Sequence, residues 1–272
     1  MKKIFSHIVL LSYILIILTP FVFVLFSSFK ENNIEIVTNP WGLPSTFNFD
    51  NYILAWKNAK IGTYFFNSFY ISTVSSVVTL LFGAATSYAL TRMKFMKASR
   101  FIYTFILLGL VIPTGSLLVP LYKLITDFNL YNTHWALILP YATFALPVSI
   151  YIICAFMRTI PSELEEAAMM DGLGAFGLFT RIILPISIPP LVTVFILNFL
   201  GNWNEFVMAN FYLSSEHLRT LPVGMVGFRD AFNTNYAQLS AGIVFSVLPV
   251  LIIYSILQEK IIEGVTAGSV KG

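Results

Sequence analysis

Polar side chains interrupt an apolar stretch of the sequence, residues 186–212, at helical spacing. Asn198, Asn202 and Glu205 follow one another at four- and three-residue offsets, so a helix would carry two amides and a carboxylate on one face. Such a face could hydrogen-bond a polar solute, and an intramembrane carboxylate could also transfer a proton. These residues and their neighbours form a candidate substrate pathway: Asn198, Asn202, Trp203, Asn204 and Glu205.

A structural role fits Glu205 as well. This residue lies about 19 residues into the stretch, which corresponds to roughly 28 Å of helix and reaches the edge of the hydrocarbon core. Trp203 could present an aromatic surface to a ligand or anchor the helix at the membrane interface. Spacing alone leaves both interpretations open.

A second polar stretch, residues 158–174, has the pattern of a short surface helix. Ser162 and Glu165 predict a capping box, and Glu163 and Glu166 add negative charge at the positive end of the helix dipole. Gly172 supplies a stop. A narrow small or apolar face, suited to packing against another protein, is predicted for positions i, i+3, i+4 and i+7: Leu164, Ala167, Ala168 and Asp171. From these residues alone, a solvated turn explains the stretch equally well.

Enzymatic chemistry finds no support in the sequence. Gly264 and Gly268 precede Lys271, but a phosphate-binding loop needs its lysine directly after the second glycine. The three histidines, His7, His134 and His217, are far apart and lack metal-ligand spacing. No nucleophile elbow of a serine hydrolase occurs. We expect no catalytic residue, no metal site and no cofactor bound by this chain.

The composition identifies the solvent that surrounds these stretches. Of the 272 residues, 57% are hydrophobic and 11% charged, and the mean hydropathy is +0.80. Soluble domains carry roughly 25% charge, so an ordinary soluble protein is excluded, and the small net charge of +3 gives no footprint for nucleic acid. We expect an all-α, polytopic membrane protein in a single domain, 1–272, with six transmembrane helices at about 8–26, 67–90, 101–122, 136–157, 186–212 and 239–257.

Charge position predicts the orientation of these spans. Both termini lie on one side because six is an even number, and that side holds ten of the sixteen cations in short segments. The positive-inside rule therefore places both termini, and the loop 158–185, in the cytoplasm. The ten cations are Lys2, Lys3, Arg92, Lys94, Lys97, Arg100, Arg158, Arg181, Lys260 and Lys271.

Prolines recur inside the apolar runs. Membrane helices tolerate such breaks where neighbours or cavity water satisfy the freed carbonyls, which suits transporters and channels better than a single-span anchor. The prolines concerned are Pro20, Pro113, Pro120, Pro140, Pro147, Pro185, Pro189, Pro190 and Pro249.

The loop resembles a known motif. Glu166-Ala167-Ala168, three residues, Gly172, nine residues and then Ile182-Ile183-Leu184-Pro185 match the pattern in the membrane subunits of binding-protein-dependent ABC importers. In that family the loop forms a cytoplasmic coupling helix that sits in a cleft of the ATPase subunit. The resemblance implies that role for Glu165, Glu166, Ala167, Ala168, Asp171, Gly172 and Gly174.

Four further segments, 67–68, 87–95, 201–206 and 263–272, resemble the carbohydrate-uptake branch of this family, and within it the smaller, maltose-permease-G-like subunits. The similarity covers nearly the full length. In that branch the C-terminal tail reaches toward the ATPase dimer interface. The resemblance implies the same contact for Gly264, Thr266, Gly268 and Lys271.

The resemblance implies a permease subunit of a type I sugar importer in a bacterial cell membrane. Its expected partners are a second homologous permease, two ATPase subunits that form a homodimer, an extracytoplasmic sugar-binding protein and lipid. ATP and Mg²⁺ would bind the ATPase subunits only. The outer segments 27–66 and 214–238 are candidate docking surfaces for the binding protein, although packing on the chain's own spans explains them as well.

Two alternatives remain at this point. The same machinery could import a non-sugar solute such as an amino acid or peptide. The chain could instead be an ion-coupled secondary transporter with Glu205 as its coupling acid.

Overall fold

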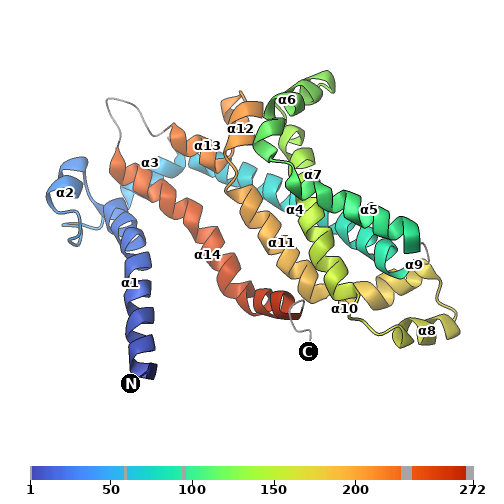
Figure 1. Ribbon diagram of the computed structural model, residues 1–272. Helices are drawn as coiled ribbons and strands as arrows, with labels where there is room; N and C mark the ends of the chain where they lie inside the picture. The colour runs from blue at the N-terminus through green and yellow to red at the C-terminus, as the bar shows by residue number, and fades with distance from the viewer. Residues whose placement is uncertain (1, 58–59, 94–95, 228–234, 268–272) are drawn as a thin grey trace. The chain divides into compact units, whose positions relative to one another are not determined.

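The computed structural model describes residues 2–57, 60–93, 96–227 and 235–267, and within these ranges all regular secondary structure is helical, with no strand. The prediction of an all-α fold is confirmed. Long apolar helices contain four of the predicted spans (Figure 1): α1 (Lys2–Phe29), α4 (Ile61–Arg92), α7 (Trp135–Met157) and α14 (Tyr236–Ala267).

The other two predicted spans are bent. Ala98–Val111 and Thr114–Asp127 meet at 89°, and Ala175–Ile186 and Ile188–Trp203 meet at 74°. The predicted span 186–212 therefore has different bounds, because its helix begins earlier, bends at Ser187 and ends at Trp203. Counting each bent pair as one span gives six. The elements of the first pair are α5 (Met96–Leu108), η1 (Gly109–Val111), η2 (Thr114–Leu117) and α6 (Leu118–Asp127).

Prolines explain where the bends fall. Pro113 stands at the first break, and Pro189 and Pro190 occupy the first turn after the second. Proline cannot donate a backbone hydrogen bond, but the first helical turn does not require one. Pro20, Pro140, Pro147 and Pro249, by contrast, lie inside continuous helices.

The chain divides into two compact units. The first contains Met1–Asn67 and Arg219–Val250, and the second contains Ser68–Leu218 and Leu251–Gly272. α4 and α14 each contribute residues to both units.

In the first unit, the segment that follows α1 folds into a small cap. Its helices are α2 (Asn33–Thr38) and α3 (Asp50–Lys57). The ammonium of Lys30 is fully buried and donates to the carbonyls of Asn39 and Pro40. The amide of Asn51 donates to the carbonyls of Ser28, at 3.0 Å, and Lys30, at 2.8 Å. Because buried polar groups are costly unless paired, these bonds fix the path of the cap.

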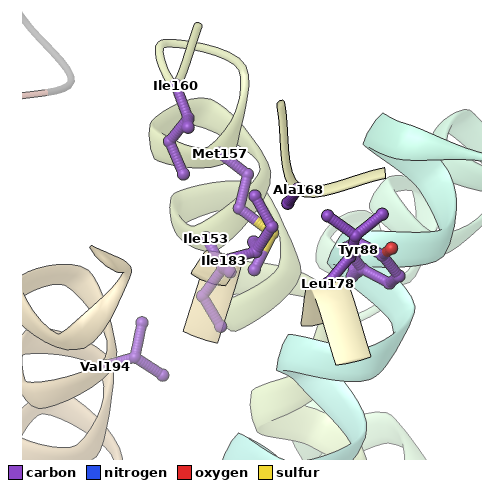
Figure 2. Packing of buried hydrophobic residues seen from close by; sticks show 8 residues of the cluster. All are labelled: Tyr88, Ile153, Met157, Ile160, Ala168, Leu178, Ile183 and Val194. Atoms are coloured by element: carbon purple, nitrogen blue, oxygen red, sulfur yellow. The ribbon is translucent and has the colours of Figure 1, made fainter. Parts of the chain in front are cut away.

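The second unit has an apolar core where the ends of several helices meet (Figure 2). α7 supplies Ile153 and Met157, α4 supplies Tyr88, and α11 (Ile188–Trp203) supplies Val194. Three short elements between α7 and α11 complete the core: α8 (Glu163–Met170) with Ala168, α9 (Ala175–Leu178) with Leu178, and the π-helical turn η3 (Phe179–Ile183) with Ile183. The short helix α10 (Leu184–Ile186) leads from η3 to the bend before α11.

Candidate functional site

The predicted coupling helix is α8, which follows α7 and precedes α9 along the chain (Figure 1). Its C-terminus is as predicted: Gly172 has a φ of +85°, and the amides of Gly172 and Leu173 donate to the carbonyls of Met169 and Ala168, both at 3.0 Å. This pair of bonds is a Schellman motif, for which glycine is favoured in the left-handed position. Gly172 therefore ends α8 as the sequence indicated.

The capping box predicted at the other end of α8 is wrong. Ser162 caps the helix through its backbone carbonyl, which accepts from the amides of Glu165 and Glu166 at 3.0 Å, and its side chain makes no cap bond. Glu165 turns instead toward Arg92 at the end of α4, with 2.9 Å between Oε1 and Nη1. A long-range ion pair has replaced the local bond.

The predicted docking face of α8 divides between the interior and the surface. Ala168 is buried in the apolar core of the second unit, beside Met157 and Leu178 (Figure 2). Glu166, Ala167, Asp171, Gly172 and Gly174 are exposed, and Leu164 is 45% exposed. One small residue thus holds the helix against the fold while its neighbours remain free to meet a partner.

The loop also carries exposed apolar side chains that the sequence patterns did not single out. Met170 is 89% exposed, Phe176 79% and Met169 53%. Flexible methionines and an aromatic ring on a surface are typical of protein-binding sites. The signal in the sequence was the apolar pair Met169-Met170, which stands among acidic residues shortly before Gly172.

The candidate substrate pathway has a different local structure from the predicted one. α11 ends at Trp203, and α12 (Val207–Tyr212) begins after a short break. The predicted continuous helical face from Asn198 to Glu205 is therefore wrong. Glu205 stands in the break, where its carboxylate accepts hydrogen bonds from the amides of Met208, at 2.8 Å, and Ala209, at 3.1 Å. The carboxylate satisfies two amides that α12 leaves unpaired at its start.

The other members of this set lie in mixed surroundings. The Asn198 amide donates to Ser149 Oγ at 3.1 Å. Trp203 is fully buried and stacks on Phe199, with 5.7 Å between ring centroids, so its face is closed to a ligand in this structure. Asn204 is exposed and donates to the Leu200 carbonyl. Asn202 Nδ2 is buried with no hydrogen-bond partner in the described part of the chain. The substrate pathway stays a prediction.

The predicted contact of the tail with the ATPase also stays a prediction. Gly264 and Thr266 lie in the last turns of α14. Gly268 and Lys271 lie outside the described residues.

The histidines form no metal centre. Within the ranges that the structure describes, no three metal-ligating side chains gather. Burial lowers the pKa of His134, which precedes α7; a hydrogen bond to the Leu218 backbone opposes this shift, and His217 adds to it. Two neighbouring imidazoles without a third ligand do not make a metal site.

Known proteins resemble the chain over nearly its full length. Residues 80–266 match the family described as "binding-protein-dependent transport system inner membrane component". The probable ABC transporter permease protein YurM of Bacillus subtilis is 40% identical over 260 residues, which cover 96% of this chain and 86% of YurM. The diacetylchitobiose uptake system permease protein NgcG of Streptomyces coelicolor is 36% identical, over 97% of this chain and 87% of NgcG.

The fold resembles a solved structure. A chain in the crystal structure of a bacterial ABC transporter involved in the import of the acidic polysaccharide alginate superimposes with a TM-score of 0.85. The match covers 95% of each chain at 21% sequence identity, so it concerns the fold alone. The region matched by the family contains the whole of α8, α11 and α12.

Proposed function

We propose a function from one premise: the chain belongs to the family of binding-protein-dependent transport system inner membrane components. It is a multi-pass membrane permease of an ABC importer. The finer proposal is that it imports a sugar or an oligosaccharide. The name of the Streptomyces relative, a diacetylchitobiose permease, supports this choice of solute.

The loop geometry carries the second part of the proposal, which is that α8 receives the motion of an ATPase. α8 is a short helix held between α7 and α9, with an acidic first turn and exposed apolar side chains beyond it. A partner that closes on this loop would therefore push against a folded helix, α8, rather than against an irregular loop. Residues Glu166, Asp171 and Gly172 on the exposed side would form the contact.

The proposed complex contains further subunits beside this chain. The chain would pair with a second homologous permease to enclose the pathway, and an ATPase homodimer would bind and hydrolyse ATP with Mg²⁺. An extracytoplasmic sugar-binding protein would deliver the solute to the outer segments. Both termini would lie in the cytoplasm of a bacterial cell, as the positive-inside rule indicates. The tail, from Gly264 to Lys271, would contact the ATPase dimer.

The structure bears differently on the two alternatives, a non-sugar solute and an ion-coupled carrier. A non-sugar solute remains possible within the same machinery, because no residue in the candidate pathway is specific for a sugar. An ion-coupled carrier is disfavoured by the surroundings of Glu205, whose two oxygens accept bonds from backbone amides and from the Tyr141 hydroxyl. Through these three bonds the carboxylate serves as a helix cap and a link to α7.

Reconstitution tests the proposal. The chain is purified with its second permease and ATPase, placed in proteoliposomes, and supplied with the binding protein and a panel of labelled oligosaccharides. We expect uptake that requires both ATP and the binding protein. Uptake driven by a proton or sodium gradient without ATP would contradict the proposal, and ATP-dependent uptake of amino acids but not sugars would support the non-sugar alternative. Isothermal titration of the binding protein with the same panel identifies the solute independently.

A further inference from the structure

Arg92, the last residue of α4, joins three elements at one guanidinium. Its Nη2 donates to the carbonyls of Met157, the last residue of α7, and of Ile160, the latter at 2.8 Å. Its Nη1 lies 2.9 Å from Glu165 Oε1 in the first turn of α8. The two charged side chains are only 11% and 14% exposed. The sequence indicated Arg92 only as one of the cations that set the orientation.

These contacts suit arginine and no other side chain. The carbonyls at the end of a helix lack intrahelical donors and carry partial negative charge, so a cation there is stabilised. A planar guanidinium with five donors can bind two carbonyls on one edge and a carboxylate on another, whereas an ammonium is a compact point charge. The contact between Arg92 and Glu165 is an ion pair by its N–O distance but not a hydrogen bond. Glu165 Oε1 has no aligned hydrogen-bond donor among the described residues.

A second contact lies one helical turn earlier in α4. The Tyr88 hydroxyl donates to the carbonyl of Ala175 at the start of α9, at 3.0 Å, and the Tyr88 ring packs on Phe179 with 5.0 Å between centroids. Ala168 of α8 is buried in the same core (Figure 2). Glu165 and Ala168, three residues apart, thus fix one face of α8 to the fold, and the last two turns of α4 touch the segments before and after it.

We propose that Arg92 is a positioning residue for energy coupling: it ties α8 to the ends of α4 and α7, so that a displacement of α8 moves both helices. The inference rests on the proposed function, since it needs a motor that displaces α8. Without the guanidinium, only the apolar contacts of Ile160, Ala168 and Leu173 would hold the loop, and α8 could be displaced while α4 and α7 stayed in place. The loss would then appear as ATP hydrolysed without transport.

The test compares variants of the complete complex in proteoliposomes. Arg92→Gln is expected to raise the ATP hydrolysed per solute imported by about tenfold, a coupling effect of ordinary size, while the amount of assembled complex stays normal. Arg92→Lys keeps the charge but loses the fork, and Glu165→Gln removes only the ion pair, so both should fall between wild type and Arg92→Gln. The double variant Arg92→Gln/Glu165→Gln should be no worse than Arg92→Gln alone, because both changes remove one shared interaction.

One exposed residue provides a matched control. Arg100→Gln removes a cation from α5 and should stay within about twofold of wild type because surface substitutions are mild. The inference is overturned if Arg92→Gln assembles and has the wild-type ratio of ATP hydrolysed to solute imported. If Arg92→Gln does not assemble, wild-type ratios in both Arg92→Lys and Glu165→Gln overturn it. So does failure of all three to assemble, which would assign the contact to folding alone. Absence of ATP-dependent uptake in the wild type would instead contradict the proposed function.

Discussion

The Tyr141 hydroxyl lies 2.5 Å from Glu205 Oε2, so α7 is hydrogen-bonded to the break between α11 and α12. The same carboxylate accepts the amides of Met208 and Ala209. Three donors therefore converge on one acidic side chain, two from the start of α12 and one from a helix far away in the sequence. This arrangement stabilises a change of helix direction at residues 204–206.

Removing the carboxylate should destabilise the protein more than removing the hydroxyl. Glu205→Ala leaves three donors without their acceptor and should cost about 2–3 kcal/mol, whereas Tyr141→Phe loses one bond and should cost about 1 kcal/mol. Thermal unfolding of the purified complex measures both. Asn204→Ala, at the exposed neighbouring position, is the matched control and should change little.

A coupling acid would behave differently at the same position. Glu205→Gln would then leave the unfolding temperature unchanged and abolish uptake driven by an ion gradient. That result would contradict the capping role.

Glu205 also shows why periodicity could not locate the break. The run from Asn198 to Ala209 contains no proline, and Gly201 lies before the break rather than in it, so the pattern predicts one helix. The helix ends because Glu205 pairs with Tyr141, 64 residues away. A contact of that range leaves no mark on local sequence. Ser162 is a similar case, since the Glu165 of its expected capping box is taken by Arg92.

Local backbone chemistry was easier to predict. Gly172 was expected to stop a helix, and it does so with a left-handed φ that only glycine adopts freely. Pro113 and the pair Pro189-Pro190 were noted among the prolines inside the apolar runs, and the bends fall beside them, whereas four other prolines of that set lie inside continuous helices. The four long helices followed from the number of consecutive apolar residues. Where the backbone geometry of a single residue decides the local structure, the sequence alone can predict that structure.

Substitutions at Gly172 can separate backbone strain from bulk. A Cβ at Gly172 would meet no atom within 4 Å, so the cost of Gly172→Ala comes only from the φ of +85° and should be about 1 kcal/mol. Asparagine tolerates this conformation, so Gly172→Asn adds bulk with less strain. If α8 docks on an ATPase, a bulky Gly172→Trp should reduce ATP-dependent uptake strongly while the protein still inserts. Normal uptake in that variant would argue against docking at this end of α8.

A buried glycine in the first unit should be intolerant of any side chain. Gly224 lies in α13 (Leu221–Val226), where a Cβ would overlap the ring of Tyr64, itself only 4% exposed. Gly224→Ala should therefore destabilise the protein by about 1–3 kcal/mol through overpacking. Gly201→Ala is the matched control, because a Cβ there meets nothing within 4 Å, and it should be neutral or slightly stabilising. The two sites should be coupled: Gly224→Ala should cost less in a Tyr64→Ala background than in the wild type, because the overlapping ring is then absent.

The cap formed by α2 and α3 contains a carboxylate whose environment predicts a pH dependence. Glu35 Oε1 accepts from the Ser45 amide at 2.7 Å, and Oε2 accepts from the Glu31 amide at 2.9 Å. These bonds, led by that from Ser45, lower the pKa of Glu35 below its ordinary value of 4.5, and partial burial opposes them. A lowered pKa in the folded protein means that ionised Glu35 stabilises the cap.

This stabilisation should be complete above the ordinary pKa of Glu35 and should disappear as the pH falls through the lower, folded-state value. Hydrogen exchange at the amides of Ser45 and Glu31, corrected for the intrinsic pH dependence, should therefore accelerate on acidification below pH 4.5. Glu35→Gln should show fast exchange at every pH, because a neutral amide accepts more weakly than a carboxylate. Glu31→Gln, which keeps the backbone amide and removes only a side-chain charge, should retain the wild-type profile. An unchanged profile in Glu35→Gln would assign the acid response of the cap to another group.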